Sequence, residues 1–316
     1  NQLFLAFLTI ATFITCTSTA KQRPEGGWLW KISGNGLSHP SYLFGTYHGT
    51  YDILYQYTDS IPELHQAFNA CSQFAGESET TSKPTPAQVG VAIKLPKDTT
   101  YADLLNKEDF HFLDSIVRQS LKSPLNKVYI KPNFLALILG EIEKGKKLVD
   151  TGYSQSRIDS MKSQVMDIAL EKKAKEKGLT IVGLEGIFDA FVSEKSNLKK
   201  EADELISDLR EDDEISPLSF VNTLSDVYRT QNMKSLIDFE VKVDSIFRTS
   251  PKLTEIGKRI REDLLKRRNL NWMNKIPELM KAQPTFIAVG VRHLPGKDGL
   301  IALLLEKGYQ VEPIGL

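Results

Sequence analysis

The chain has 316 residues, of which 41% are hydrophobic and 25% are charged, as in an ordinary globular protein. This length allows one large domain, or one domain with an insertion. Forty basic and forty acidic residues cancel, whereas a nucleic-acid-binding protein usually carries a basic excess. We therefore expect no nucleic-acid partner.

The first 20 residues differ from the rest of the chain. Residues 3–14 are almost wholly apolar, and no charge occurs before Lys21. This run is too short to span a membrane, which takes about 20 apolar residues. It is typical of a secretory signal peptide, with the small residues 18–20 as the cleavage site. We expect residues 1–20 to be a signal peptide and the protein to be exported, as a periplasmic, extracellular or lipid-anchored protein. A buried amino-terminal helix is the alternative.

The chain has two cysteines, Cys16 and Cys71. Residues 13–16 loosely resemble a bacterial lipobox, so a lipid anchor at Cys16 is the only membrane contact that we predict. Without the leader only Cys71 remains, and no disulfide can form within the mature chain. Cys71 ends an apolar helix, which favours a small core residue.

The first elements after the leader predict a sheet. Residues 28–48 are typical of two short strands, and Asn35-Gly36 is a hairpin signal between them. Ser60 can cap a helix that ends near Cys71. A short strand at residues 72–75 then ends at Gly76-Glu77. This strand, helix, strand order favours a βαβ unit with parallel neighbours.

A mostly helical stretch follows at about residues 80–178, with helices predicted at 110–121, 134–142 and 159–177. Gly178 is in the position that ends the last of these helices.

A strand at residues 179–182 ends near Glu185, and a second helical stretch runs over about residues 187–281. The chain closes with a strand, a helix and a strand, at residues 285–289, 297–307 and 309–314. We predict an α/β fold: a central mixed sheet flanked by helices, in one domain of residues 21–316 with two helical insertions.

Four predicted strands end in a glycine that is soon followed by a side chain able to bind a metal or a proton. These side chains are His48, Glu77, Glu185 and His293. In an open α/β sheet, sites form outside the carboxyl ends of the strands. If these strands adjoin, two imidazoles and the carboxylates share one pocket. Two histidines with a carboxylate are a recurrent set for a divalent transition metal, and a remaining carboxylate can act as a general base.

Each of these residues also has a simpler interpretation. A histidine at a strand end is usually just hydrogen-bonded, Glu77 could be a solvated loop acid, and Glu185 could cap the next helix. Arg268 lies on a long predicted helix with Trp272 four residues on. It is either an exposed basic residue or a guanidinium that binds a carboxylate or carbonyl oxygen in the pocket.

Residues 43–48, Leu-Phe-Gly-Thr-Tyr-His, and the closing stretches 286–300 and 308–311 resemble the TraB/GumN family, which includes pheromone-shutdown proteins and the Tiki proteases. The resemblance spans about residues 28–316. It implies a fold similar to erythromycin-esterase-like and ChaN-like proteins. It also implies divalent-metal peptidase activity for the two Gly-x-x-His motifs, which end here at His48 and His293.

The same resemblance places further family positions on Glu77, Asp167, Leu184-Glu185 and Arg268-Asn269. Arg292 stands directly before His293. A cation beside a metal ligand disfavours a charged centre, unless it points away or pairs with an acid.

We therefore predict an exported metal-dependent hydrolase acting on a peptide or protein substrate, or on another acyl bond. His48, Glu77 and His293 hold manganese, cobalt or zinc, Glu185 activates water, and Arg268 steadies the substrate oxyanion. The alternative is a non-catalytic protein that binds haem, as ChaN-like relatives do, or sequesters a peptide, as pheromone-shutdown relatives do. Tyr47 or a histidine would then ligate the haem iron. The oligomeric state is not predicted.

Overall fold

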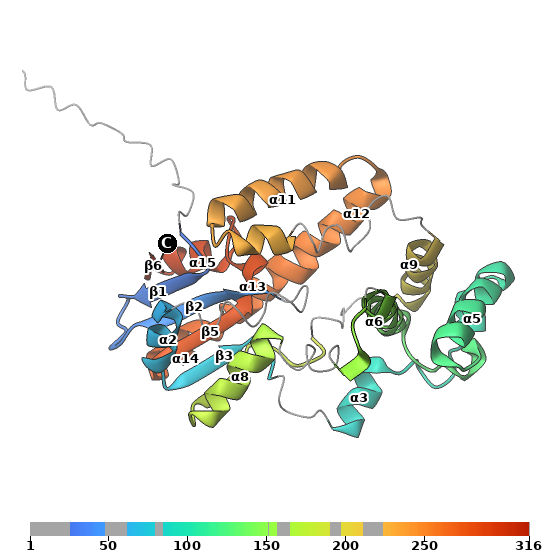
Figure 1. Cartoon of the computed structure of the whole chain (residues 1–316), viewed down its shortest axis with the longest axis horizontal. Coiled ribbons are helices and arrows are strands. Elements are labelled where there is room, and N and C mark those ends of the chain that lie inside the picture. The colour runs from blue at the N-terminus through green and yellow to red at the C-terminus, as the bar shows by residue number, and fades with distance from the viewer. Residues whose placement is uncertain are drawn as a thin grey trace, which may run out of the picture.

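The computed structural model describes residues 26–47, 62–79, 85–150, 152–156, 165–189, 197–210 and 224–315. It confirms the mixed α/β fold, in which helices flank a six-stranded mixed sheet (Figure 1). The strands are β1 (Leu29–Ser33), β2 (Ser41–Thr46), β3 (Gln73–Gly76), β4 (Thr180–Gly183), β5 (Thr285–Gly290) and β6 (Gln310–Ile314). Their order in the sheet is β4-β3-β5-β2-β1-β6.

Four neighbouring strands, β4, β3, β5 and β2, run parallel, and β1 is antiparallel to both β2 and β6. The β1–β2 hairpin is confirmed, and Asn35 and Gly36 at its turn have φ of 45° and 80°. The prediction that β2 and β3 are neighbours is wrong, because β5 lies between them. Five of the six β5 residues are buried, and a strand with this apolar content is stable only in the middle of a sheet.

In the part of the chain that the structure describes, the helices around the sheet include α2 (Pro62–Asn69), α8 (Met166–Glu176), α11 (Met233–Phe247), α14 (Ile276–Ala282) and α15 (Leu300–Glu306). Helix α8 contacts β3 and β4, and α15 contacts β6. Between the layers lies an apolar core, in which Phe74 stacks on Phe286 with ring centroids 6.3 Å apart and Phe44 packs beside them. Burial of these large rings is a main source of stability.

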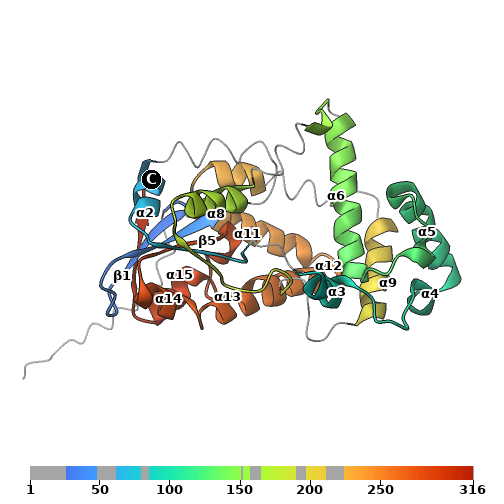
Figure 2. The same ribbon diagram turned by 90° about the horizontal axis from the view of Figure 1, so that it is seen from below.

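A second group of helices has its own core (Figure 1). Its members are α4 (Tyr101–Leu104), α5 (Lys107–Leu121), the 3₁₀ helix η1 (Leu125–Lys127), α6 (Pro132–Asp150) and α9 (Leu198–Arg210). Helix α3 (Pro86–Ile93) is joined to them by a hydrogen bond from the Lys131 amide to the Ile93 carbonyl. Helix α9 belongs to the second predicted insertion but packs on α4 and α6 from the first. Figure 2 shows the long α6 beside the sheet half of the molecule. Parts of both predicted insertions therefore build one helical group, whereas α8, α11 and α14 from the same stretches pack in the core around the sheet.

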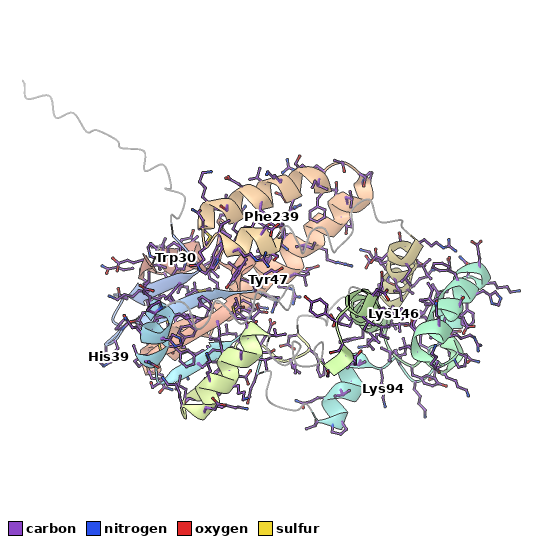
Figure 3. All side chains as sticks on the ribbon, viewed as in Figure 1. Trp30, His39, Tyr47, Lys94, Lys146 and Phe239 are labelled. Atoms are coloured by element: carbon purple, nitrogen blue, oxygen red, sulfur yellow. The ribbon has the colours of Figure 1, made fainter. Side chains whose placement is uncertain are left out.

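A continuous helical segment leads into the site: α12 (Pro251–Arg259), the π-helix η2 (Ile260–Lys266) and α13 (Arg267–Trp272). π-Helical turns are rare and frequently lie at functional sites. Figure 3 shows His39 before the outer end of β2 and Tyr47 after its inner end, so the carboxyl ends of the parallel strands face the middle of the molecule. Helix α13 lies at these ends (Figure 1).

Some predicted bounds change. The helix expected at residues 297–307 begins only at Leu300, because residues 294–299 form a tight turn with Gly296 at φ 86°. Helix α6 is longer than the predicted 134–142, and of the helix predicted at 159–177 the structure describes Met166–Glu176. None of the helices in the described ranges combines the length and apolarity that a membrane crossing requires. The predicted leader and Cys16 lie outside the described residues.

Candidate functional site

The sheet order brings the predicted strand-end residues to one edge. Glu185 follows β4, Glu77 follows β3, and His293 ends the 3₁₀ helix η3 (Val291–His293) directly after β5. Pairing continues past the strands, since the Glu185 amide donates to the Glu77 carbonyl at 2.8 Å. His48 comes two residues after β2, the next strand along, and lies outside the described residues. The four strands adjoin in the order β4-β3-β5-β2, so the condition on which a shared pocket depended is met.

A glycine allows two of these strand ends to touch. A Cβ atom at Gly45 in β2 would lie 2.9 Å from Val291 Cγ2 and 3.1 Å from Leu294 Cδ2. Both distances are closer than side chains normally approach, so only glycine fits without rearrangement. The turn that carries His293 therefore packs directly on the strand that leads to His48.

Arg268 lies at the centre of the site. Its Nε is 2.9 Å from Glu185 Oε1, and its Nη2 donates to Glu77 Oε2 at 2.5 Å and to Glu185 Oε1. The side chains of Arg268, Glu185 and Glu77 are only 10%, 11% and 18% exposed. Burial opposes the charge of Arg268, but its hydrogen bonds and attraction to Glu185 and Glu77 outweigh that effect and raise the pKa of the guanidinium.

Both carboxylates have further donors. The Gly290 amide donates to Glu77 Oε1 at 2.7 Å, and Trp272 Nε1 donates to Glu185 Oε2 at 3.1 Å. The Arg268 guanidinium also lies over the Trp272 ring, with its Cζ atom 4.7 Å from the ring centroid. Hydrogen bonds to the ionised form hold a carboxylate in place as an anion. The two carboxylates are thus fixed on either side of Arg268.

His293 completes the group. The residue is 4% exposed, and its ring lies 4.5 Å from the Trp272 ring. Its Nε2 is 3.2 Å from Arg268 Nη1 and 3.8 Å from Glu77 Oε1. Its Nδ1 is 2.7 Å from Asn269 Oδ1. One edge of the imidazole therefore faces the charged cluster, and the other is held by α13.

The family model of the TraB/PrgY/gumN family matches residues 28–313. The chain belongs to the TraB/PrgY/gumN family. No curated protein and no solved structure shows significant similarity to the chain. In this TraB/PrgY/gumN protein the matched range contains all four strand-end residues and α13.

Of the other predicted site residues, Asp167 lies in the first turn of α8 and accepts from Thr46 Oγ1 at 2.8 Å. Thr46 ends β2 and pairs with Gly290, whose amide binds Glu77, so Asp167 borders the site. Tyr47 is different: it is 3% exposed and stacks on Tyr228 at 5.2 Å. Figure 3 shows it in the sheet half.

Arg292 does not face the cluster as an uncompensated cation. Its Nε and Nη2 bind the two oxygens of Glu240 on α11, at 2.5 and 2.9 Å. Of the two conditions that the sequence left open for a metal centre beside Arg292, pointing away or pairing with an acid, the pairing is present. Glu240 itself, 52 residues away in the chain, carries no sequence signal for this contact.

Two described side chains can share a metal ion. Glu77 Oε1 and His293 Nε2 are 3.8 Å apart, less than twice the ~2.0–2.2 Å of a typical bond to zinc, so one ion can bond to both. Among the described residues no three His, Cys, Asp or Glu side chains form a metal-binding group. His48, the third predicted ligand, is outside them. Because Nε2 has one lone pair, its hydrogen bond to Arg268 must be released when an ion binds there.

In this TraB/PrgY/gumN protein the sequence did not predict three contacts of the site: Trp272 as a donor to Glu185, Asn269 as a partner of His293, and the Gly290 amide as a donor to Glu77. Arg268 and Trp272 are four residues apart and therefore share a helix face, which was a usable signal. The main-chain donor had no signal, because its role depends on the position of β5 beside β3.

Proposed function

We propose that this protein is a metal-dependent hydrolase that cleaves peptide bonds or another acyl bond. One observation carries the proposal: Glu77 and His293 lie 3.8 Å apart at the carboxyl ends of neighbouring parallel strands, beside a buried arginine. This edge of an open α/β sheet is where ligands bind. Together Glu77, Glu185 and Arg268 carry one excess negative charge, which suits a divalent cation.

In the proposal His293 Nε2 and the Glu77 carboxylate hold the ion, together with His48. Nitrogen and oxygen ligands suit manganese, cobalt or zinc. When bound, such an ion polarises a carbonyl and lowers the pKa of water to about 7. The positive charge of Arg292 does not oppose that of the ion, since Glu240 neutralises the charge of Arg292.

Arg268 binds the substrate carbonyl oxygen. It is a fixed cation at the site, and its raised pKa keeps it charged throughout the pH range of enzyme assays. A guanidinium held in place before the reaction stabilises negative charge as it develops on that oxygen. An ion bound at His293 Nε2 would displace Arg268 Nη1 from the imidazole, and Nη1 would then be able to donate to the substrate.

Glu185 has a role that the sequence alone did not indicate. Both of its oxygens already accept hydrogen bonds, from Arg268 and from Trp272. These contacts favour a positioning role for Glu185, in which it fixes the guanidinium, over the predicted activation of water.

The test is peptide cleavage by the full chain with added Mn²⁺, Co²⁺ or Zn²⁺, read by mass spectrometry on a mixture of peptides. We expect metal-dependent cleavage that falls at least a hundredfold in the His293→Ala, His48→Ala and Glu77→Gln variants. His39→Ala is the matched control, because His39 is exposed at the other end of β2. Equal rates in wild type and all three site variants would refute the proposal.

The haem-binding alternative finds less support. Tyr47, one of its two predicted kinds of ligand beside a histidine, is almost fully buried and would have to leave the core and its stacking on Tyr228. Titration with haemin gives the answer: a Soret shift that disappears in Tyr47→Phe or in His48→Ala would favour this alternative over the hydrolase.

We also propose that the protein is exported. The support is the apolar run in residues 1–20, which precedes the family match. The mass of the mature protein from its native host tests this: loss of the first 20 residues, or a lipid on Cys16, supports export, and an intact leader contradicts it.

A further inference from the structure

We propose that Asn269 is a positioning residue that fixes the proton of His293 on Nδ1, so that the lone pair of Nε2 points at the charged cluster. The effect on catalysis rests on the proposed hydrolase function, but the position of the proton does not. The inference follows from which neighbouring atoms can donate a hydrogen bond and which can only accept one.

The orientation of the Asn269 amide is determined by its surroundings. Its Nδ2 lies 3.2 Å from the carbonyl oxygen of His293 and 2.8 Å from that of Asp298. Carbonyl oxygens only accept hydrogen bonds, so the amide nitrogen must be on this side. Oδ1 therefore faces His293 Nδ1 at 2.7 Å. Because this oxygen accepts, Nδ1 must carry the proton.

The other side of the ring gives the same answer independently. His293 Nε2 lies 3.2 Å from Arg268 Nη1. A guanidinium has five donors and no acceptor, so Nε2 must accept and cannot carry a proton in this arrangement. Two neighbours of opposite character, an amide oxygen and a guanidinium, thus select one tautomer of a neutral imidazole.

The consequence concerns the chemistry of Nε2. In this tautomer its lone pair is directed to the side where Glu77 lies, 3.8 Å away. Metal-ligating histidines commonly donate their other ring N–H to a fixed acceptor, which sets the ring orientation and raises ligand basicity. Asn269 is 1% exposed and also ties the turn after β5 to α13, so ring and turn are held by one side chain.

The direct test is a ¹⁵N-histidine spectrum of the full chain at pH 8 without added metal, with the His293 signals assigned from a His293→Gln variant. We expect a pyrrole-type Nδ1 and a pyridine-type Nε2. A protonated Nε2 in the wild-type protein would overturn the proposal. This measurement needs no activity, so it stands apart from the test of the proposed function.

Two substitutions test the role of Asn269. Asn269→Asp keeps an acceptor for Nδ1–H but loses the donor to the His293 and Asp298 carbonyls, so we expect the same tautomer and a lower stability. Asn269→Leu removes the acceptor while Arg268 still donates to Nε2, so we expect the tautomer to be kept but the Nδ1 signal to shift as its hydrogen bond is lost. Asn271→Leu is the matched control, since Asn271 is exposed on the same helix. An unchanged His293 spectrum in Asn269→Leu would overturn the assignment, and if that variant does not fold, the wild-type and Asn269→Asp spectra decide.

Metal affinity gives the functional readout, measured by calorimetry with Mn²⁺ or Zn²⁺. Loss of a hydrogen-bond partner of this kind typically weakens binding about 10–100-fold. We expect that loss in Asn269→Leu, a smaller change in Asn269→Asp and none in Asn271→Leu. Equal affinity of the wild type and Asn269→Leu would contradict the positioning role, whereas no metal binding to the wild type, with the predicted tautomer present, would refute the proposed function alone.

Discussion

Removal of the Arg268 charge should destabilise the protein strongly. In Arg268→Met the aliphatic stem remains, but Glu77 and Glu185 stay buried at 18% and 11% exposure without their shared cation. Removing one partner of a buried ion pair typically costs about 3–5 kcal/mol, because the remaining charge is uncompensated. Two carboxylates lose their partner here, so we expect the upper part of that range in the free energy of unfolding.

Urea denaturation at pH 7, followed by tryptophan fluorescence and circular dichroism, measures this loss. Arg267→Met is the control: it removes a charge from the adjacent position, where the side chain is only partly buried, and should change stability by less than about 0.5 kcal/mol. Arg268→Met/Glu185→Gln should regain part of the loss. A loss below about 1 kcal/mol in Arg268→Met would refute the view that the guanidinium holds the two carboxylates.

The same variant should show a defined pH dependence. Without Arg268 the buried carboxylates take up protons more easily when folded than when unfolded, so their pKa in the folded variant is raised. Because of this raised pKa, the stability that Arg268→Met loses relative to the wild type is small below about pH 4.3, the pKa of a glutamate in the unfolded chain. The loss grows as the pH rises to 7. A deficit that is the same at pH 4.5 and pH 7 would point to lost packing instead of uncompensated charge.

Three further outcomes are expected. Gly45→Ala places a methyl group 2.9 Å from Val291 and should cost about 1–3 kcal/mol in urea denaturation; an unchanged midpoint would contradict the close approach. Glu240→Gln and Arg292→Met should each lower the free energy of unfolding by about 1 kcal/mol, and the double variant should lose less than the sum of the two. Losses that add fully would show that the two side chains do not interact. Burial raises the pKa of the Cys71 thiol from 9.0 to about 12, so iodoacetamide at pH 8 should alkylate it roughly a thousandfold more slowly in the folded than in the unfolded chain; comparable rates would contradict its burial.

The sequence predicted much of the fold because its local signals are strong. Asn35-Gly36 marks the hairpin, and apolar runs that end in glycine mark β3, β4 and β5. The order of the strands is different, because it depends on contacts between distant segments. β5 joins the sheet after two long helical stretches and separates β2 from β3, and no local pattern encodes that position.

The site divides in the same way. The strand-end residues Glu77, Glu185 and His293 could be found, since strand ends and glycines are visible in the sequence. Their partners could not be assigned. The hydrogen bonds of Arg268 to both Glu77 and Glu185 depend on where α13, which follows the π-helix η2, lies at the strand ends. The helical group likewise combines α9 with α6, although more than 40 residues separate the two helices.

The proposal that Glu77 and His293 share a divalent metal has a direct test. Crystals of the full chain grown with Mn²⁺, Co²⁺ or Zn²⁺ can be measured at the absorption edge of the metal. We predict one strong anomalous peak within bonding distance of His293 Nε2 and a Glu77 oxygen, with Arg268 Nη1 moved off the imidazole. A peak elsewhere, or none while Arg268 still donates to His293, would contradict the metal centre.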